Sequence, residues 1–173
     1  MEFFASGRTS VAAQAVGAAQ GALDAAIEYA NQREQFDQKI SDFQAIQHKI
    51  AEMATKVEAA RSLTYRAATQ VEQENQDVAA QYSSMAKYFA SEISVEVADE
   101  GIQVHGGSGY VTDYPAERYY RDARITKIYE APARSRRTSS PTRSCNRAPL
   151  ADGSGTRTFD IFAVRNWIAV TLS

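Results

Sequence analysis

The chain has 173 residues, of which 44% are hydrophobic and 23% charged, and its formal net charge is −2. These values are typical of one globular domain and exclude a fibrous or wholly disordered chain. The lone Cys145 excludes an internal disulfide, and no apolar run approaches the roughly 18 residues that a membrane helix needs. No secretory signal or metal-ligand pattern is visible either, so we expect a cytoplasmic protein without a metal site.

Charge is distributed unevenly along the chain. Residues 1–130 contain 12 Lys and Arg against 19 Asp and Glu, whereas residues 131–173 contain 7 against 2. The acidic body argues against a main role in binding a phosphate backbone. The basic tail leaves nucleic-acid binding as an alternative, but it has no repeat, motif or amphipathic period, and we expect no such binding.

The first predicted helix spans Val11–Gln35, with Thr9 or Ser10 as the expected N-cap. Its apolar and small residues recur with a period of 3.6 and are mostly alanine, which lets a neighbouring helix approach closely. They are Val11, Ala15, Ala19, Leu23, Ala26, Ile27 and Ala30.

A second helix is predicted from about Asp42 to Gln73. Ser41 and Gln44 have the spacing of a capping box, in which a serine and a glutamine three residues later satisfy free amides at a helix start. The expected buried stripe again has helical spacing. It consists of Phe43, Ile46, Ile50, Met53, Val57, Ala60, Thr64, Ala67 and Val71.

The third predicted helix spans Asp77–Val104 and is ended by the glycines after His105, because glycine adopts the left-handed conformation that closes a helix. A short fourth helix is predicted at about Ala116–Arg124, with Pro115 in its first turn. The expected stripe of the third helix is Val78, Tyr82, Met85, Phe89, Ile93, Val97 and Ile102.

These elements predict an all-α, up-down four-helix bundle of three long helices and a short fourth, over residues 1–130. After Glu130 the sequence is rich in Arg, Ser, Pro, Thr and Ala and has no period. We therefore expect residues 131–173 to form a disordered, irregular tail.

Four segments occur in the order in which one enzyme family has them. Tyr29–Phe36 reads Y-A-N-Q-R-E-Q-F, Phe43-Gln44 follows, Gln103–Tyr110 reads Q-V-H-G-G-S-G-Y, and Arg121–Glu130 reads R-D-A-R-I-T-K-I-Y-E. On these motifs the chain resembles the acyl-CoA dehydrogenases over roughly residues 7–130, and within them only the C-terminal helical bundle. That family has a helical and a β-domain before the bundle, so the resemblance implies a fragment that lacks both.

The resemblance implies a homo-oligomer that binds FAD, because the family's bundles assemble into dimers or tetramers and contact the cofactor partly across subunits. Guanidinium groups suit pairs of phosphate oxygens, and glycine lets a backbone approach a ligand closely. The implied contacts are Arg33 and Gln35 at the pyrophosphate, Phe43 and Gln44 beside the same cofactor, and Gln103, Val104, His105, Gly106 and Gly107 along its adenine half.

These residues also have structural interpretations, which the sequence leaves open. Arg33 also suits an exposed position near a helix end, Gln44 a capping residue, and Gly106 and Gly107 an ordinary helix stop. His105 belongs to the segment beside the cofactor rather than to the reacting carbon, and we do not expect it to act as a base.

The resemblance implies that Glu130 is the catalytic base, which removes the α-proton of an acyl-CoA while the β-hydrogen leaves as hydride to the flavin. A carboxylate can do this only if burial raises its pKa and the thioester carbonyl is hydrogen-bonded. Some members place the base on the first bundle helix, where this chain has Gly7, which leaves Glu130 as the only candidate. Arg8 matches an arginine near the acyl-CoA, but the family's preceding Asp is here Ala5, and a solvated charge before the first helix is the open alternative. An electron-transferring flavoprotein is the implied electron acceptor.

The match ends after Glu130, where the family continues Gly-Thr-Ser-Glu-Ile-Gln and this chain has Ala131–Arg136. Codons for residues 131–146 can be written so that one restored G encodes a family-like final helix, which indicates a frameshift by a single-nucleotide deletion. We expect the chain alone to be inactive. The alternative is a non-catalytic helical association module, or the remnant of a disrupted gene.

Overall fold

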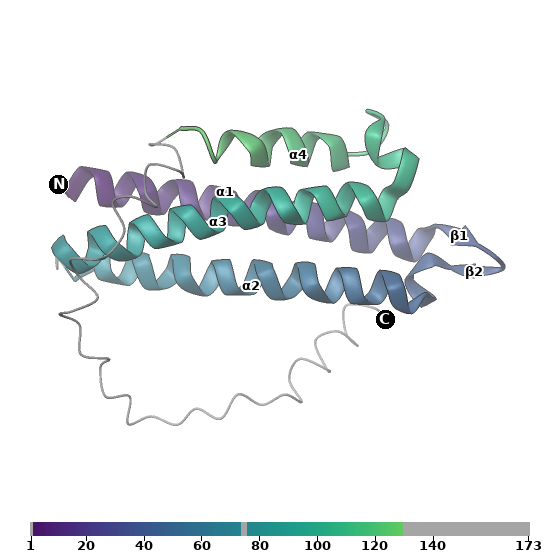
Figure 1. Ribbon diagram of the computed structural model, residues 1–173, viewed down its shortest axis with the longest axis horizontal. Helices are drawn as coiled ribbons and strands as arrows, with labels where there is room; N and C mark the ends of the chain where they lie inside the picture. Colours follow the sequence, from purple (N-terminus) through teal and green to yellow (C-terminus); the bar gives the residue numbers. More distant parts are fainter. Residues whose placement is uncertain (1, 74–75, 130–173) are drawn as a thin grey trace, which may run out of the picture.

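The computed structural model describes residues 2–73 and 76–129, which form an up-down helical bundle (Figure 1). Its helices are α1 (Glu2–Gln32), α2 (Gln44–Glu72), α3 (Gln76–His105) and α4 (Ala116–Ile125). Strands β1 (Glu34–Gln35) and β2 (Gln38–Lys39) and the 3₁₀ turn η1 (Ile40–Asp42) join α1 to α2, and the 3₁₀ helix η2 (Gly106–Tyr110) follows α3. The predicted all-α bundle is confirmed for this part of the chain. The predictions for Cys145 and the tail at 131–173 lie outside the described residues.

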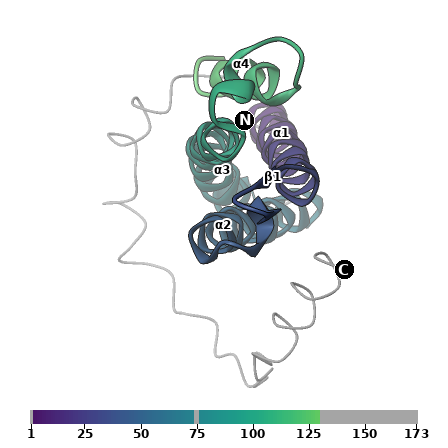
Figure 2. The same cartoon turned by 90° about the vertical axis from the view of Figure 1, so that its right-hand side faces the viewer.

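Three long helices pack side by side, and α4 lies on the α1–α3 pair, on the side away from α2 (Figures 1 and 2). The α1–α3 contact is built largely from alanine, as the alanine-rich stripe of the first predicted helix indicated. Ala15 and Ala26 of α1 and Ala86 of α3 have no exposed surface. Side chains of one carbon let the two helix backbones approach closely, so α3 becomes the central helix of the bundle.

The stripe predicted for α2 is confirmed where the helix faces its neighbours, since Ile50, Met53, Val57, Ala60, Thr64 and Ala67 are buried. The stripe predicted for α3 is confirmed in part, since Ile93 and Val97 are buried and Tyr82 and Phe89 pack against the core. Met85 is 45% exposed, and Ser83, Lys87, Ser91 and Ser94 are fully buried instead. Small residues make up much of the buried face of α3, which suits its close approach to α1.

Two predicted helix caps are also wrong. The first helix begins nine residues before Val11, and the hydroxyls of Thr9 and Ser10 donate to the carbonyls of Ala5 and Ser6 one turn earlier. These two residues are therefore inside the helix and cap nothing.

The capping box expected at the start of α2 does not form. Ser41 is buried in η1, Phe43 is the N-cap residue, and no side chain caps the helix. The side-chain amide of Gln47 donates instead to the carbonyl of Ser41, at 3.0 Å.

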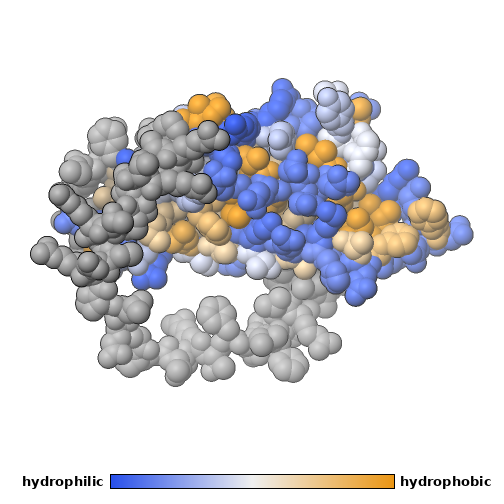
Figure 3. All heavy atoms as spheres, in the orientation of Figure 1, coloured by the Kyte–Doolittle hydropathy of each residue, from blue (hydrophilic) through white to orange (hydrophobic). Residues whose placement is uncertain are grey.

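Ion pairs between helices add to the apolar contacts. Lys49 pairs with Glu100 at 2.5 Å, and Lys56 lies 3.2 Å from Glu96, so both pairs join α2 to α3. Polar and apolar residues are interspersed over the face of the bundle shown in Figure 3. None of the helices in the described segments is both long and apolar enough to cross a membrane.

Candidate functional site

The link between α1 and α2 is a tight β-hairpin, which the sequence did not predict. Glu34 pairs with Lys39 and Gln35 with Gln38, and the turn between them consists of Phe36 and Asp37. Both turn residues have positive φ, 56° and 61°, as a two-residue hairpin turn requires. Asn-Gly or Asp-Gly is the usual signal for such a turn, and its absence explains why sequence reasoning missed the hairpin.

The hairpin exposes the side chains that the sequence assigned to the pyrophosphate. Arg33 and Gln35 are exposed, and the amide of Gln35 donates to the carbonyl of Glu34 at 2.5 Å. Phe36 at the turn is 88% exposed, and its ring lies edge-on to Phe43, with centroids 6.3 Å apart. The hairpin therefore presents a guanidinium, an amide and an aromatic ring outward.

Phe43 and Gln44 stand at the start of α2, next to the base of the hairpin. Phe43 is half-buried, and Gln44, the first residue of the helix, is exposed. The positive end of the α2 dipole lies here, which together with the Arg33 guanidinium favours an anionic ligand.

The glycine segment after α3 has three positions with different constraints. Gly106 has φ +61°, so a side chain there would be strained. A Cβ on Gly107 would meet nothing within 4 Å, whereas one on Gly109 would lie 2.7 Å from the carbonyl oxygen of Ile102. Gly109 is thus required by the packing of this chain, and Gly107 leaves an open approach to its backbone.

The preceding residues of this segment divide between surface and core. Gln103 is exposed, as are Gly106 and Gly107, but Val104 and His105 are only 4% and 5% exposed. The ring nitrogen Nδ1 of His105 lies 2.7 Å from the carbonyl oxygen of Gly101. Val104 and His105 therefore point into the bundle and can shape a ligand site only by holding its exposed neighbours in place.

An aromatic cluster that the sequence did not single out joins the end of α1 to the glycine segment. Tyr29 of α1 stacks on His105, with ring centroids 4.3 Å apart, and its hydroxyl donates to Oγ of Ser108 at 3.3 Å. Tyr114 lies edge-on to Tyr29 at 5.3 Å. The available signal was the position of Tyr29 at the start of the Y-A-N-Q-R-E-Q-F motif.

Arg8 lies near the other end of the bundle. Its Nη1 donates to Oγ of Ser84 on α3, at 2.9 Å. Arg8 and Arg33 are separated along α1 by roughly 37 Å at the helical rise of about 1.5 Å per residue. One copy of the bundle therefore cannot bring Arg8 and Arg33 to the same small group of atoms.

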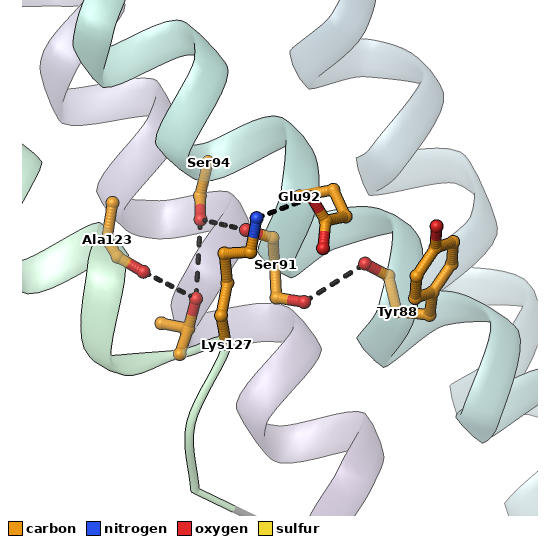
Figure 4. Close-up of polar contacts among 7 residues, drawn as sticks. Tyr88, Ser91, Glu92, Ser94, Ala123 and Lys127 are labelled. Atoms are coloured by element: carbon orange, nitrogen blue, oxygen red, sulfur yellow. Dashed lines mark hydrogen bonds and ion pairs between the residues drawn. The ribbon is translucent and has the colours of Figure 1, made fainter. Parts of the chain in front are cut away.

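Glu130, the predicted base, lies outside the described residues, but the chain before it is firmly anchored. Thr126 is 1% exposed and donates to the carbonyl of Ala123 at 2.7 Å, and Nζ of Lys127 pairs with Glu92 of α3 at 2.5 Å (Figure 4). The Tyr129 hydroxyl donates to the side chain of Gln14 on α1, and burial raises the pKa of that phenol above its ordinary value of 10.0.

Within the described residues, no group of three or more His, Cys, Asp or Glu side chains is placed to hold a metal ion.

A model of the acyl-CoA dehydrogenase C-terminal domain matches residues 1–134. The chain belongs to the acyl-CoA dehydrogenase family. It is 52% identical over 124 residues to CarC, a subunit of the caffeyl-CoA reductase-Etf complex of Acetobacterium woodii, covering 72% of this chain and 32% of that protein. The chain thus spans about a third of the length of the curated relatives it matches.

Solved structures of the family have the same fold. Butyryl-CoA dehydrogenase from Megasphaera elsdenii superposes with a TM-score of 0.74 at 40% identity, covering 78% of this chain and 35% of that one. An acyl-CoA dehydrogenase from Bacillus anthracis, solved as a complex with FAD, has a TM-score of 0.71 at 36% identity, covering 76% of this chain and 26% of that one. The family-level prediction made from the four motifs is confirmed.

Proposed function

We propose that the bundle is the C-terminal part of an FAD-dependent enzyme that dehydrogenates an acyl-CoA to the trans-2-enoyl-CoA. One observation carries this proposal: the end of α1, the start of α2 and the end of α3 lie at the hairpin end of the bundle (Figure 1), and Arg33, Gln44 and Gln103, from three separate motifs, are exposed on these segments. Their exposure leaves these side chains free to contact one extended ligand. Relatives that include a butyryl-CoA dehydrogenase and a dehydrogenase solved with FAD support this choice of ligand.

The exposed groups suit FAD chemically. A guanidinium at the hairpin and the start of α2 favour a pyrophosphate, and the open backbone at Gly106 and Gly107 leaves room for a flat ring system. When bound, FAD supplies the acceptor for a hydride. In the proposal Arg33 and Gln35 hold the pyrophosphate, Phe43 and Gln44 flank it, and the exposed part of the glycine segment lies along the adenine half.

The chain's own contribution to the chemistry is Glu130. Its carboxylate takes the α-proton of the acyl thioester, the electron pair of that C–H bond forms the C=C double bond, and the β-hydrogen leaves as hydride. Arg8 steadies the acyl-CoA near that carboxylate. Tyr129, the residue before Glu130 in the sequence, is tied through its hydroxyl to Gln14, on the same half of α1 that carries Arg8.

The separation of the candidate residues supports an oligomer. Arg8 and Arg33 are roughly 37 Å apart along α1, so a complete site draws its two sets of residues from different copies or from further parts of a longer enzyme. We therefore propose that the chain assembles as a dimer or tetramer, and that a single isolated copy is inactive.

An electron-transferring flavoprotein is the proposed electron partner, and the name of the relative CarC, part of a reductase-Etf complex, supports it. We propose a cytoplasmic location for the pair.

The test is to purify the chain, scan its absorbance for flavin, titrate it with FAD and size it by light scattering. We expect FAD to bind a dimer or tetramer, and Arg33→Ala to weaken binding by about tenfold or more, since a charge-assisted hydrogen bond contributes about 1.5–3 kcal/mol. Arg121→Ala is the matched control, because Arg121 is also exposed but pairs with Glu117 on α4. Equal FAD affinity of the two variants would refute the role of Arg33.

A second candidate is a non-catalytic association module. The exposure of Phe36, Tyr110 and Val111, at 88%, 84% and 46%, favours it, because large exposed apolar side chains promote association. Mixing the chain with an intact relative discriminates the two functions. If the chain is part of a catalytic site, the mixture should contain more bound flavin than the intact relative alone. If it is only an association module, mixed oligomers should form without additional flavin.

We also propose that a single-nucleotide deletion separates residues 131–173 from the family sequence. Sequencing the DNA across the codon of Glu130 tests this. We expect that inserting one G after that codon gives a reading frame that encodes the family-like helix. A DNA sequence in which no such insertion restores the family sequence would refute the deletion.

A further inference from the structure

Tyr29 stands in the last turn of α1, shortly before the hairpin Glu34–Lys39, and its side chain contacts the glycine turn Gly106–Tyr110. Its carbonyl accepts a hydrogen bond from the backbone amide of Arg33 at 2.9 Å, the helical bond that closes α1 just before the hairpin. The amide of Ile40 donates to the carbonyl of Arg33 at 2.9 Å and closes the base of the hairpin.

The side chain of Tyr29 holds the other segment. Its ring stacks on His105 at an interplanar angle of 27°, and its hydroxyl reaches Oγ of Ser108 inside the turn. His105 is fixed in its turn, since Nδ1 lies 2.7 Å from the carbonyl oxygen of Gly101 and Tyr114 packs edge-on at 5.9 Å. The ring of Tyr29 thus rests on a partner that α3 holds in place.

We infer that Tyr29 is a positioning residue that fixes the hairpin and the glycine turn relative to each other, so that a change in one is transmitted to the other. The exposed groups on each side, Arg33 and the backbone of Gly106 and Gly107, contact one ligand best when their separation is fixed, and the half-buried Tyr29 connects the end of α1 to the glycine turn. The consequence for FAD rests on the proposed function, whereas the coupling itself does not.

Amide hydrogen exchange on the full chain, measured by mass spectrometry, tests the coupling. Tyr29→Phe removes only the hydroxyl, and Ser108→Ala removes its acceptor. Each should speed exchange by about two- to tenfold in both the glycine turn and the hairpin, the range of one hydrogen bond, and the double variant should add little. Tyr29→Leu, which also loses the stack on His105, should have the largest effect.

Tyr110→Phe is the matched control, because it removes a hydroxyl from the same turn at a side chain that is 84% exposed. It should leave exchange in both segments unchanged. The inference is overturned if Ser108→Ala changes only its own turn. It is equally overturned if Tyr29→Phe speeds exchange throughout α1 and α3 with a lower melting temperature, since that result marks a purely structural role.

FAD titration of the same variants separates this inference from the proposed function. We expect Tyr29→Leu to weaken FAD binding at least tenfold and Tyr110→Phe to leave it unchanged. If the unaltered chain does not bind FAD, the proposed cofactor role fails, and the exchange data still decide whether Tyr29 couples the two segments.

Discussion

The three glycines after α3 allow a sharp test, because they lie in one turn and the structure constrains them differently. A Cβ at position 109 would lie 2.7 Å from the carbonyl oxygen of Ile102 and 2.9 Å from Cβ of His105. Overpacking of this kind costs about 1–3 kcal/mol, and the loss of glycine freedom in the unfolded chain returns about 0.4–1 kcal/mol. Gly109→Ala should therefore lower the free energy of unfolding by about 1–1.5 kcal/mol.

Gly107→Ala should have the opposite effect, since its Cβ would meet nothing within 4 Å. The free energy of unfolding should rise by about 0.4–1 kcal/mol. With a urea m-value of about 2 kcal/mol/M, the two midpoints should differ by about 1 M. Gly107→Ala should nevertheless weaken FAD binding, if the backbone there approaches the cofactor as proposed.

The assay is urea unfolding of the full chain followed by circular dichroism at 222 nm, with the parent and Gly106→Ala measured alongside. Gly106→Ala should be destabilised by about 1–2 kcal/mol, because its φ of +61° is unfavourable for alanine. A Gly109→Ala variant at or above the parental midpoint, or equal losses at positions 107 and 109, would refute the packing argument.

Two further predictions concern the helices. Gly21→Ala places a Cβ 2.5 Å from a ring carbon of Tyr119, so it should loosen α4 and lower the unfolding free energy by about 1 kcal/mol, whereas Gly17→Ala, in open space, should raise it by about as much. Hydrogen exchange in α4 distinguishes the two variants. The hydrogen bond to Glu52 raises the pKa of Lys56 above its ordinary value of 10.5, a second one to Glu96 adds to this, and partial burial opposes both. Stability from this group is fully present below about pH 10.5 and is lost as the pH rises through the higher folded-state pKa. The midpoint difference between the parent and Lys56→Met should shrink above that pH, and a constant difference up to pH 11.5 would contradict the assignment.

Local sequence signals predicted those features that depend on spacing along the chain. The period of 3.6 residues located the buried face of α2, including Ile50, Val57 and Ala60, because a helix buries one continuous stripe whatever its partner. The glycines marked the end of α3 within one residue. The motifs alone identified Arg33 and Gln103 as candidate ligand contacts.

The same signals failed where a distant part of the chain decides the outcome. Met85 fits the apolar period of α3 but is 45% exposed, whereas the nearby Ser83, Ala86 and Lys87 are fully buried. Ser41 has the spacing of a capping residue, but η1 buries it before the helix begins. Contacts of this kind with distant residues cannot be predicted from the local sequence.

The sequence by itself therefore determined the all-α class, the number of helices, the family and the identity of most candidate residues, since each follows from residue types at short, regular spacings. Only the tertiary structure decided how those residues are arranged. It placed Tyr29 against Ser108, turned His105 inward and left Gln103 exposed, and it placed Arg8 and Arg33 at opposite ends of one helix. These arrangements depend on which helices pack together and how closely, and that is set by the whole set of buried surfaces rather than by any one segment.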